Sequence, residues 1–476
     1  MAILDILFIT PDSSKEVYQG LADRYSAIEP PVWALLLAGA LRDKYKVGIL
    51  DPLAEGLSDH EAWLRIVSER PKLICFVVYG QNPNSGTTNM AGAARLAEYI
   101  KGREAIPIAF IGSHPSALPK ETYELYYVDY VLPGDGLEGL KKIMEGAKEG
   151  IIWGNPSPPS AFPAYAWDLI PSLDHYRAHV WHCNFDESQR SPFAAIYTSL
   201  GCKFKCDFCM INMVNKSSPN QLDSSQSTGI RYFSTEFVLR ELETLQKMGV
   251  KNVRLSDEMF FFNKNHYLPI VRGIIERGIK LNLWAYARVD TVRPEYLAEF
   301  KKAGINWLCL GIEASNQKIR REISKGSYEE TDVRQVCKEI QDSGINLLAN
   351  FIFGLPDEDI SSMEETLKLA LEINAEHTNY YPCMALPGTP LYRQAAVSGI
   401  PLPDKWSAFS FHSYDCLPLP TKHCSAAEVL AFRDEAWTKT SLNPAYLELA
   451  DRKFGTAKAI KKQAEIQLKR KILEAR

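Results

Sequence analysis

The feature that most constrains this 476-residue chain is a repeated alternation of short apolar runs with amphipathic stretches. In the first 150 residues the apolar runs occupy residues 6–9, 47–50, 74–78, 108–111 and 128–132. The stretches between them, such as 32–44 and 90–101, have helical periodicity. Because strands that are apolar on both faces are typical of parallel sheets covered by helices, we predict a doubly wound, Rossmann-like α/β domain over residues 1–150. Its ligands are expected on loops that follow the strands.

A second alternation begins at Phe193, after a segment rich in proline. Residues 151–172 hold five of the 28 prolines, and we interpret residues 151–192 as a linker. Six further apolar runs follow, at residues 193–198, 253–256, 281–286, 307–311, 347–353 and 377–384. Six consecutive strand–helix units predict a partial (β/α)6 TIM-like barrel over residues 193–391, with function on the loops after the strands. The rhythm then ends, and residues 392–476 are predicted to form a small, mainly helical C-terminal region with helices at 426–437 and 457–475.

Composition excludes several classes of protein. Hydrophobic residues make up 46% of the chain and charged residues 24%, with a net charge of −4, so the chain is neither disordered nor a nucleic-acid binder by bulk charge. No apolar run is long enough for a membrane span, and the first ten residues lack a basic segment of the signal-peptide type. We therefore expect a cytoplasmic protein. The segment 455–476, with seven basic and two acidic residues, is interpreted as an amphipathic helix docked on the protein.

Three of the ten cysteines stand close together, immediately after the first strand of the predicted barrel. Cys202, Cys206 and Cys209 form a CxxxCxxC motif. Three thiolates on one loop can bind three irons of a cubane cluster and leave the fourth iron open to chemistry. Zinc is the alternative, but a structural zinc site needs a fourth ligand, and His182 and Cys183 are only loosely placed for that role. The spacing favours an iron–sulfur cluster.

With Phe208 directly before the last cysteine, the motif resembles the CxxxCx(aromatic)C signature of the radical S-adenosylmethionine (SAM) superfamily. The resemblance implies that Cys202, Cys206 and Cys209 bind a 4Fe-4S cluster and that SAM chelates its open iron. In that family, one-electron reduction of the cluster cleaves SAM to methionine and a 5'-deoxyadenosyl radical. It also implies an electron-donating partner, such as flavodoxin or ferredoxin.

Loops after later strands resemble the SAM-binding loops of the same family. By this resemblance Asp257 and Glu258 receive the amino group of SAM, and Arg288 can fork onto its carboxylate. Glu313 resembles the family's glutamate at its position, and Ser315 is able to hydrogen-bond ribose or carboxylate oxygens. Solvated acids and a surface ion pair are the ordinary structural alternatives for these charged groups.

The fifth and sixth strands end in further family segments. Gly354 lies in a turn similar to the one that packs on the adenine of SAM, and residues 387–392 read PGTPLY, a segment common in cobalamin-associated members. A doubly wound domain ahead of the barrel likewise resembles the cobalamin-binding subgroup. Residues 112–119 are similar to its GGxHPTxxP loop and residues 128–136 to its VDYVVxGEGE segment.

Cobalamin is therefore the third implied cofactor. By analogy, residues 79–88 run beside its nucleotide tail, and glycines in the other two loops admit a bulky flat ligand close to the backbone. The residues implied in cobalamin binding are Tyr79, Ser85, Thr87, Gly112, Ser113 and Gly134.

One departure from the cobalamin-binding pattern concerns the metal. Members that coordinate cobalt through histidine carry DxHxxG after the first strand, whereas residues 10–15 contain no histidine. Residues 51–56 match the spacing with Leu53 in place of histidine, but they follow the second strand. We predict that the lower face of cobalamin lacks a protein histidine, and we interpret His114 as a residue that hydrogen-bonds within a turn.

The family resemblance implies a cobalamin-dependent radical SAM enzyme. We predict a methyltransferase that moves a methyl group from methylcobalamin to an unactivated carbon of a small-molecule substrate through a 5'-deoxyadenosyl radical. No catalytic side chain is assigned, and neither nucleic acid nor a membrane is expected as a partner. Three alternatives stay open: a cobalamin-dependent oxidative cyclase or ring-rearranging enzyme, a radical enzyme whose first domain has lost cobalamin, and a non-catalytic cobalamin or iron–sulfur sensor.

Overall fold

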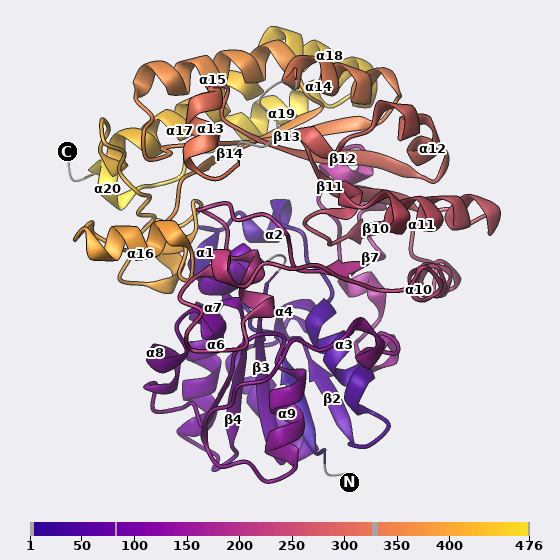
Figure 1. Ribbon diagram of the computed structural model, residues 1–476, viewed down its shortest axis with the longest axis vertical. Helices are drawn as coiled ribbons and strands as arrows, with labels where there is room; N and C mark the ends of the chain where they lie inside the picture. Colours follow the sequence, from indigo (N-terminus) through magenta and orange to yellow (C-terminus); the bar gives the residue numbers. More distant parts are fainter. Residues whose placement is uncertain (1–3, 81–82, 326–331, 475–476) are drawn as a thin grey trace.

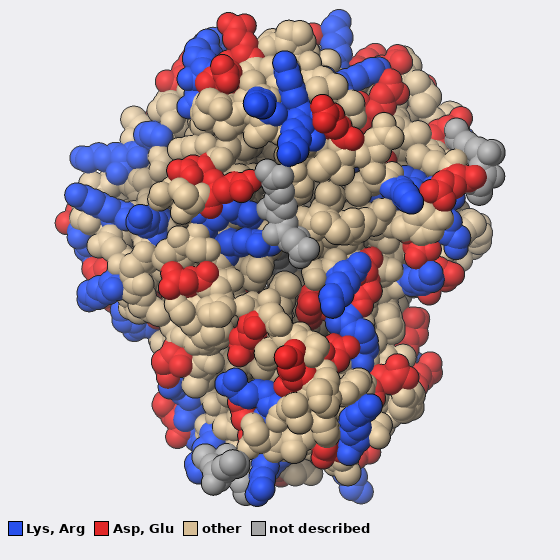
Figure 2. All heavy atoms as spheres, turned by 180° about the vertical axis from the view of Figure 1, so that it is seen from behind, with Lys and Arg blue, Asp and Glu red and all other residues tan. Residues whose placement is uncertain are grey.

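A computed structural model of the chain describes residues 4–80, 83–325 and 332–474. Figure 1 shows an indigo-to-purple α/β domain in the lower half, with the second α/β domain and the yellow C-terminal helices above it. No helix in this described part combines the length and the apolar character that a bilayer span requires. On the face seen in Figure 2, basic and acidic side chains are intermingled.

The first domain is built on a six-stranded parallel sheet with the strand order β2-β1-β3-β4-β5-β6. The strands are β1 (Ile6–Ile9), β2 (Val47–Leu50), β3 (Leu73–Val78), β4 (Ile108–Gly112), β5 (Tyr130–Leu132) and β6 (Gly150–Ile151). Its main helices are α3 (Val32–Leu41), α5 (Asp59–Glu69), α6 (Gly86–Lys101) and α9 (Leu137–Met144). The doubly wound fold is therefore as predicted. The strand order reverses between β1 and β3, and open α/β sheets of this kind bind ligands beyond the strands at such a point.

Helix α3 shows why the linker lies close to this domain. All of its residues except Ala40 are buried, because one face covers the sheet and another contacts the linker. A Cβ on Gly39 would lie 1.9 Å from the carbonyl oxygen of Ala164, so only glycine permits the close approach. The backbone N–H of Ala166 also donates to the carbonyl of Leu35 at 3.2 Å.

The second domain is a six-stranded parallel sheet in which consecutive strands are neighbours, in the order β14-β13-β12-β11-β10-β7. The strands are β7 (Phe193–Ile196), β10 (Asn252–Leu255), β11 (Asn282–Arg288), β12 (Ile305–Glu313), β13 (Asn346–Phe353) and β14 (His377–Pro382). The helices along it are α10 (Thr235–Lys247), α11 (Lys264–Glu276), α12 (Leu297–Lys302), α13 (Gln317–Glu322), α14 (Val333–Asp342) and α15 (Ile360–Ile373). Within the described residues β7 and β14 do not pair, so the barrel is incomplete, as the count of six units predicts. A short antiparallel pair of strands, β8 (Ser199–Leu200) with β9 (Arg231–Tyr232), adjoins it.

The C-terminal region is helical, but its helices differ from those predicted. The helices are α16 (Pro390–Val397), α17 (Ala426–Ser441), α18 (Pro444–Phe454), α19 (Ala457–Ala464) and α20 (Lys471–Glu474). Helix α18 was not predicted, and a single helix over 457–475 is wrong because the chain leaves the helical path after Ala464. The cause is Arg470, which is buried and hydrogen-bonds both carboxylate oxygens of Asp434, at 2.9 and 3.0 Å.

Asp51, which follows β2, joins the first domain to the linker and provides a test of the fold. It accepts hydrogen bonds from the Ala54 N–H and the Tyr176 hydroxyl, each at 3.2 Å, and its burial raises its pKa from 3.8 to about 7. The native state therefore holds a proton that the unfolded chain releases, so this group costs stability as the pH rises from about 4 to about 7.

We expect Asp51→Asn to remove that loss of stability. Measured by urea unfolding, the difference in unfolding free energy between the variant and the parent protein should change by about 2–3 kcal/mol in favour of the variant from pH 5 to pH 8. An equal difference in stability at the two pH values would contradict this prediction.

Candidate active site

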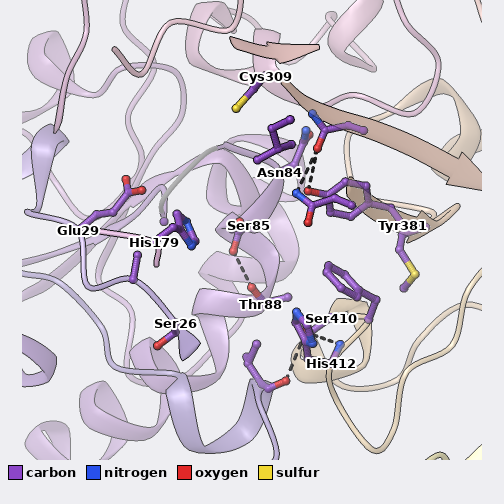
Figure 3. Close-up of a pocket in the computed structure, with 18 of the residues that line it drawn as sticks. Ser26, Glu29, Asn84, Ser85, Thr88, His179, Cys309, Tyr381, Ser410 and His412 are labelled. Atoms are coloured by element: carbon purple, nitrogen blue, oxygen red, sulfur yellow. Dashed lines mark hydrogen bonds between the residues drawn. The ribbon is translucent and has the colours of Figure 1, made fainter. Parts of the chain in front are cut away.

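One cavity of about 1010 Å³ lies between the carboxyl ends of the two sheets (Figure 3). Thr10 and Tyr79, which follow β1 and β3, belong to its wall on the first-domain side. The ends of the barrel strands supply the opposite wall, and the C-terminal region closes a third side with residues such as Phe411. Because the strands of both sheets point their carboxyl ends at this space, the loops expected to carry function meet there.

The three cysteines of the motif lie on the loop between β8 and the 3-10 helix Ile211–Asn215, and all three line the cavity. Each sulfur lies near an N–H donor. The Phe204 backbone N–H is 3.5 Å from the sulfur of Cys202, and the Arg288 Nη1 is 3.9 Å from that of Cys206. The Asn84 Nδ2, from the first domain, is 3.8 Å from the sulfur of Cys209. Such donors suit sulfur atoms that carry negative charge.

The electrostatics of the loop also suit a cluster. Burial raises the pKa of the Cys202 thiol to about 12 and raises those of Cys206 and Cys209, so three thiolates need compensating positive charge. Lys325 and Arg288 supply it, since both lower the pKa of Cys206. Among the described residues, no three His, Cys, Asp or Glu side chains are grouped to hold one metal ion. A cubane cluster binds each cysteine through a different iron, so the donor set fits it better than a single zinc ion.

The two predicted acidic residues after β10 have different surroundings. Asp257 is buried outside the cavity wall and accepts hydrogen bonds from the Thr198 N–H and hydroxyl, at 2.5 and 2.7 Å, and from the Ser199 hydroxyl. Glu258 lines the cavity, its Oε1 atom is buried and has no partner in the described structure, and burial raises its pKa to about 7. Asp257 therefore braces the strand end, whereas Glu258 is the carboxylate available to a ligand in the cavity.

Arg288 ends β11 beside the cysteine loop. Its guanidinium stacks 3.7 Å from the centre of the Phe204 ring and donates to both carboxylate oxygens of Asp290, at 3.0 and 3.2 Å. It also donates to the carbonyl of Lys325 at 3.1 Å. The predicted contact with a SAM carboxylate would have to share the guanidinium with Asp290, and the Nη1 atom already lies 3.9 Å from the sulfur of Cys206.

Glu313 ends β12 in an unusual backbone conformation. The register between β12 and β13 shifts between Gly311 and Glu313, and Glu313 has a φ of 67°, in the left-handed region. Non-glycine residues in that region are uncommon and concentrate at functional sites, where the surrounding structure holds them. The bulge presents the carboxylate to the cavity, where it forms a buried ion pair with Lys325.

The other three predicted SAM residues divide between the wall and the layer behind it. Phe208 lines the cavity. Ser315 does not; its N–H and hydroxyl lie 3.1 and 3.2 Å from the Thr366 hydroxyl. Gly354, with a φ of 82°, also lies off the wall, and a Cβ there would be 2.4 Å from a methyl carbon of Val429 on α17. The turn at Gly354 therefore packs against the C-terminal region.

On the first-domain side, Tyr79 and Ser85 lie on the cavity wall. Tyr79 stacks on Trp33 with a centroid distance of 4.5 Å and donates its hydroxyl to the carbonyl of Gly134. Thr10, on the same wall, has a buried hydroxyl oxygen with no partner in the described structure. An uncommitted hydroxyl at the point where the strand order reverses fits a ligand bound there, as cobalamin would be.

The remaining predicted cobalamin residues lie behind this wall. Thr87 and Ser113 are fully buried. A Cβ on Gly112 would lie 2.4 Å from the carbonyl oxygen of Val78, and one on Gly134 would lie 2.4 Å from that of Lys216. Both glycines thus make room for protein backbone, which differs from the expectation that they make room for a flat ligand.

His114 lies behind the wall as well. Its Nδ1 atom is 3.2 Å from the Thr87 hydroxyl, and burial lowers its pKa to about 4. The interpretation as a hydrogen-bonding residue within the protein agrees with this contact.

Two site residues were not singled out from the sequence. Lys325 pairs with Glu313 although it stands twelve positions later, outside any recognisable motif. Asn84 falls within the loop 79–88, but nothing in the sequence indicates that it contacts a cysteine of the second domain. Only the packing of the two domains brings it there.

Two family comparisons agree with the two sheets. The radical SAM superfamily profile matches residues 196–370, and the B12-binding domain profile matches residues 18–143. The chain belongs to the radical SAM superfamily and carries a B12-binding domain. Its cofactors are accordingly a 4Fe-4S cluster, SAM and cobalamin. The residues that bind them, and the four segment boundaries predicted from the sequence, stay predictions.

Three relatives are similar to this chain over most of its length. An uncharacterised methyltransferase of Pyrococcus horikoshii is 24% identical over 94% of this chain and 94% of its own length. Hopanoid C-3 methylase of Methylococcus capsulatus is 25% identical over 76% of this chain and 68% of its own. The anaerobic magnesium-protoporphyrin IX monomethyl ester cyclase of Rubrivivax gelatinosus is 23% identical over 86% of this chain and 72% of its own.

A solved structure shares the whole fold. The radical SAM methyltransferase TsrM of Kitasatospora setae, determined with cobalamin and a [4Fe-4S] cluster bound, has a TM-score of 0.66. The match covers 98% of this chain and 99% of that protein at 16% sequence identity. The likeness establishes the arrangement of a B12-binding sheet, a partial barrel and a helical C-terminal region.

Proposed function

We propose that this enzyme is a cobalamin-dependent radical SAM methyltransferase acting on an unactivated carbon of a small molecule. The observation that carries the proposal is that Cys202, Cys206 and Cys209 line the same cavity as Thr10 and Tyr79. Groups bound at the two sites would share one enclosed space. The methyltransferase relatives in Pyrococcus and Methylococcus support this choice of reaction.

When bound, the cluster and SAM supply hydrogen abstraction, and cobalamin supplies a methyl group. The chain has to hold these groups and a substrate in fixed positions and keep water away from them. The cysteines would hold the cluster, and Glu258 would bind and orient the ammonium group of SAM. The buried pair of Lys325 and Glu313 would fix the neighbouring wall.

The cavity floor, which the barrel strands form, favours a small, largely apolar substrate. The inward-facing residues Trp284, Tyr286 and Leu348 are apolar or aromatic, and polar groups stand among them. Two of these are Asn350 and Asn379, whose side chains are hydrogen-bonded to each other at 3.2 Å. Such a floor gives a substrate apolar contact area together with hydrogen-bonding groups that can orient it.

A reductant such as flavodoxin or ferredoxin completes the proposal. Lys203 and Lys205 alternate with the cysteines on the loop and are exposed, whereas the cysteines line the cavity. Their positive charges suit an acidic electron-donor protein. The cytoplasmic location predicted from the sequence stays a prediction.

The second candidate function is cobalamin-dependent oxidative cyclisation or ring rearrangement. The Rubrivivax cyclase, which matches 86% of this chain, favours it. The same cavity serves either reaction, because both need a substrate held between SAM and cobalamin. The mass of the product separates them, since methylation adds one carbon and cyclisation adds none.

The proposal is tested by anaerobic incubation of the enzyme, reconstituted with cluster and cobalamin, with SAM, a reductant and a metabolite extract. We expect 5'-deoxyadenosine and a new product that carries the methyl group of isotopically labelled SAM. A new product without the label would support the cyclase. Failure of the reconstituted enzyme to cleave SAM would contradict both.

Glu258→Gln tests the SAM site. The substitution keeps the shape of the side chain but removes the charge that would bind an ammonium group. A hydrogen bond between charged groups is worth about 1.5–3 kcal/mol, so the Kd for SAM should rise roughly 10- to 100-fold. The measurement is calorimetric titration of the cluster-loaded protein, with the exposed Glu365→Gln as the matched control. An unchanged Kd for Glu258→Gln would remove this residue from the SAM site.

A further inference from the structure

Asn84 is the point at which the first domain reaches the cysteine loop. It lies in the 3-10 helix Pro83–Ser85, between β3 and α6, and it lines the cavity (Figure 3). Its Oδ1 atom accepts a hydrogen bond from the backbone N–H of Met210 at 2.9 Å. Its Nδ2 atom is 3.8 Å from the sulfur of Cys209.

The first of these contacts sets the orientation of the second. A backbone N–H can only donate, so the atom of Asn84 that faces Met210 must be the amide oxygen. The amide nitrogen then faces the sulfur of Cys209. Among the described residues, the donors near the other two sulfurs, Phe204 and Arg288, belong to the second domain. Cys209 has two donors: the backbone N–H of Ile211, from the second domain, and the side chain of Asn84, which is the one donor among these that comes from the first domain.

The segment that follows Cys209 is firmly docked on the first domain. Met210 and Met213 pack with Ala117 in one apolar cluster. The Lys216 ammonium donates to the carbonyl of Ser116 at 2.9 Å. These contacts hold the backbone around Met210 against the first domain and so keep it within hydrogen-bonding distance of the Asn84 side chain.

We propose that Asn84 is a positioning residue through which the first domain sets the reduction potential of the cluster on the barrel loop. The inference rests on the proposed cluster at Cys202, Cys206 and Cys209. An N–H donor to a cluster sulfur stabilises the reduced state, which carries one more negative charge, and so raises the potential. Correct docking of the B12-binding domain thus makes the cluster easier to reduce.

Two substitutions separate this role from a purely structural one. Asn84→Asp keeps an oxygen for the Met210 N–H but places a carboxylate beside the sulfur, and Asn84→Leu removes the donor without adding charge. Asn89 lies on the same cavity wall and, in the described part of the chain, makes no hydrogen bond to a cysteine, so Asn89→Asp and Asn89→Leu serve as matched controls. The measurement is a potentiometric titration of the cluster followed by EPR without SAM, together with iron and sulfide content.

We expect Asn84→Leu to shift the ratio of reduced to oxidised cluster at a fixed potential about tenfold toward oxidised, which corresponds to ~59 mV for one electron. Asn84→Asp should shift it further in the same direction, and both Asn89 variants should stay near the parent value. A structural role predicts the opposite order, with Asn84→Asp closer to the parent protein than Asn84→Leu.

An Asn84→Asp potential equal to or above that of the parent protein would overturn the inference. If Asn84→Leu binds less iron than the parent protein, the comparison of Asn84→Asp with Asn89→Asp decides. Absence of a cluster from the reconstituted parent protein would instead count against the proposed function.

Discussion

Replacing Cys206 with alanine is expected to abolish the reductive cleavage of SAM. Cys206 lies at the centre of the motif and lines the cavity, and the positive charges of Arg288 and Lys325 both act on it. With one of the three thiolates missing, one iron of a cubane cluster loses its protein ligand, and the loop has no fourth cysteine to replace it. The release of 5'-deoxyadenosine by the reconstituted variant should fall to the level of a sample without protein. Iron and sulfide content should fall with it.

The matched control is Cys337→Ala. Cys337 is buried on α14 and does not line the cavity. This variant should retain both the cluster and the cleavage of SAM. Full activity in the Cys206 variant would contradict the assignment of the cluster site.

The second large effect is expected from Arg254→Ala, at the interface of the two domains. Arg254 on β10 donates to both carboxylate oxygens of Glu29 in the first domain at 2.8 Å, and the two side chains are 2% and 5% exposed. The guanidinium also lies 4.8 Å from the centre of the Trp284 ring. Removing one partner of a buried pair leaves an uncompensated charge, so the variant should lose about 3–5 kcal/mol of unfolding free energy.

The loss should depend on pH. Burial raises the pKa of Glu29 even with Arg254 present, and the Arg254 guanidinium opposes that shift, so its removal should raise the pKa further. Glu29 in the variant then takes up a proton in the native state, which relieves the penalty at low pH. Urea unfolding should therefore show a smaller difference from the parent protein at pH 5 than at pH 8.

A double variant provides the control for this prediction. Arg254→Met combined with Glu29→Gln removes both charges and keeps most of the volume, so it should recover much of the stability lost by Arg254→Ala. Equal instability of the single and double variants would show that packing of the Arg254 side chain, not the buried charge of Glu29, accounts for the loss.

The sequence predicted the sheets well because their strands are apolar on both faces. The strand found at Leu73–Val78 and the one at Asn346–Phe353 each begin within one residue of the predicted run. The C-terminal region was harder, because Arg470 is strongly polar and its burial depends on Asp434, which is far away in sequence. No local periodicity records such a pairing.

The site was predicted unevenly for a similar reason. The cysteine motif carries its own spacing, so Cys202, Cys206 and Cys209 could be placed on one loop facing a cavity. Gly112 and Gly134 could be recognised as special but not explained, because the atoms they accommodate come from Val78 and Lys216. Which residue of a loop reaches the cavity wall depends on how the two domains pack, and the local sequence of a loop does not predict that packing.

The cavity is walled by three separate parts of the chain, and this division bears on substrate selectivity. The C-terminal part, through residues such as Phe411, Trp437 and Leu468, contributes wall surface without carrying any of the predicted cofactor residues. We expect changes in this part to alter which substrates fit, provided that Val429, which packs against the predicted SAM residue Gly354, is kept. Exchange of residues 392–476 between relatives becomes a rational route to altered selectivity.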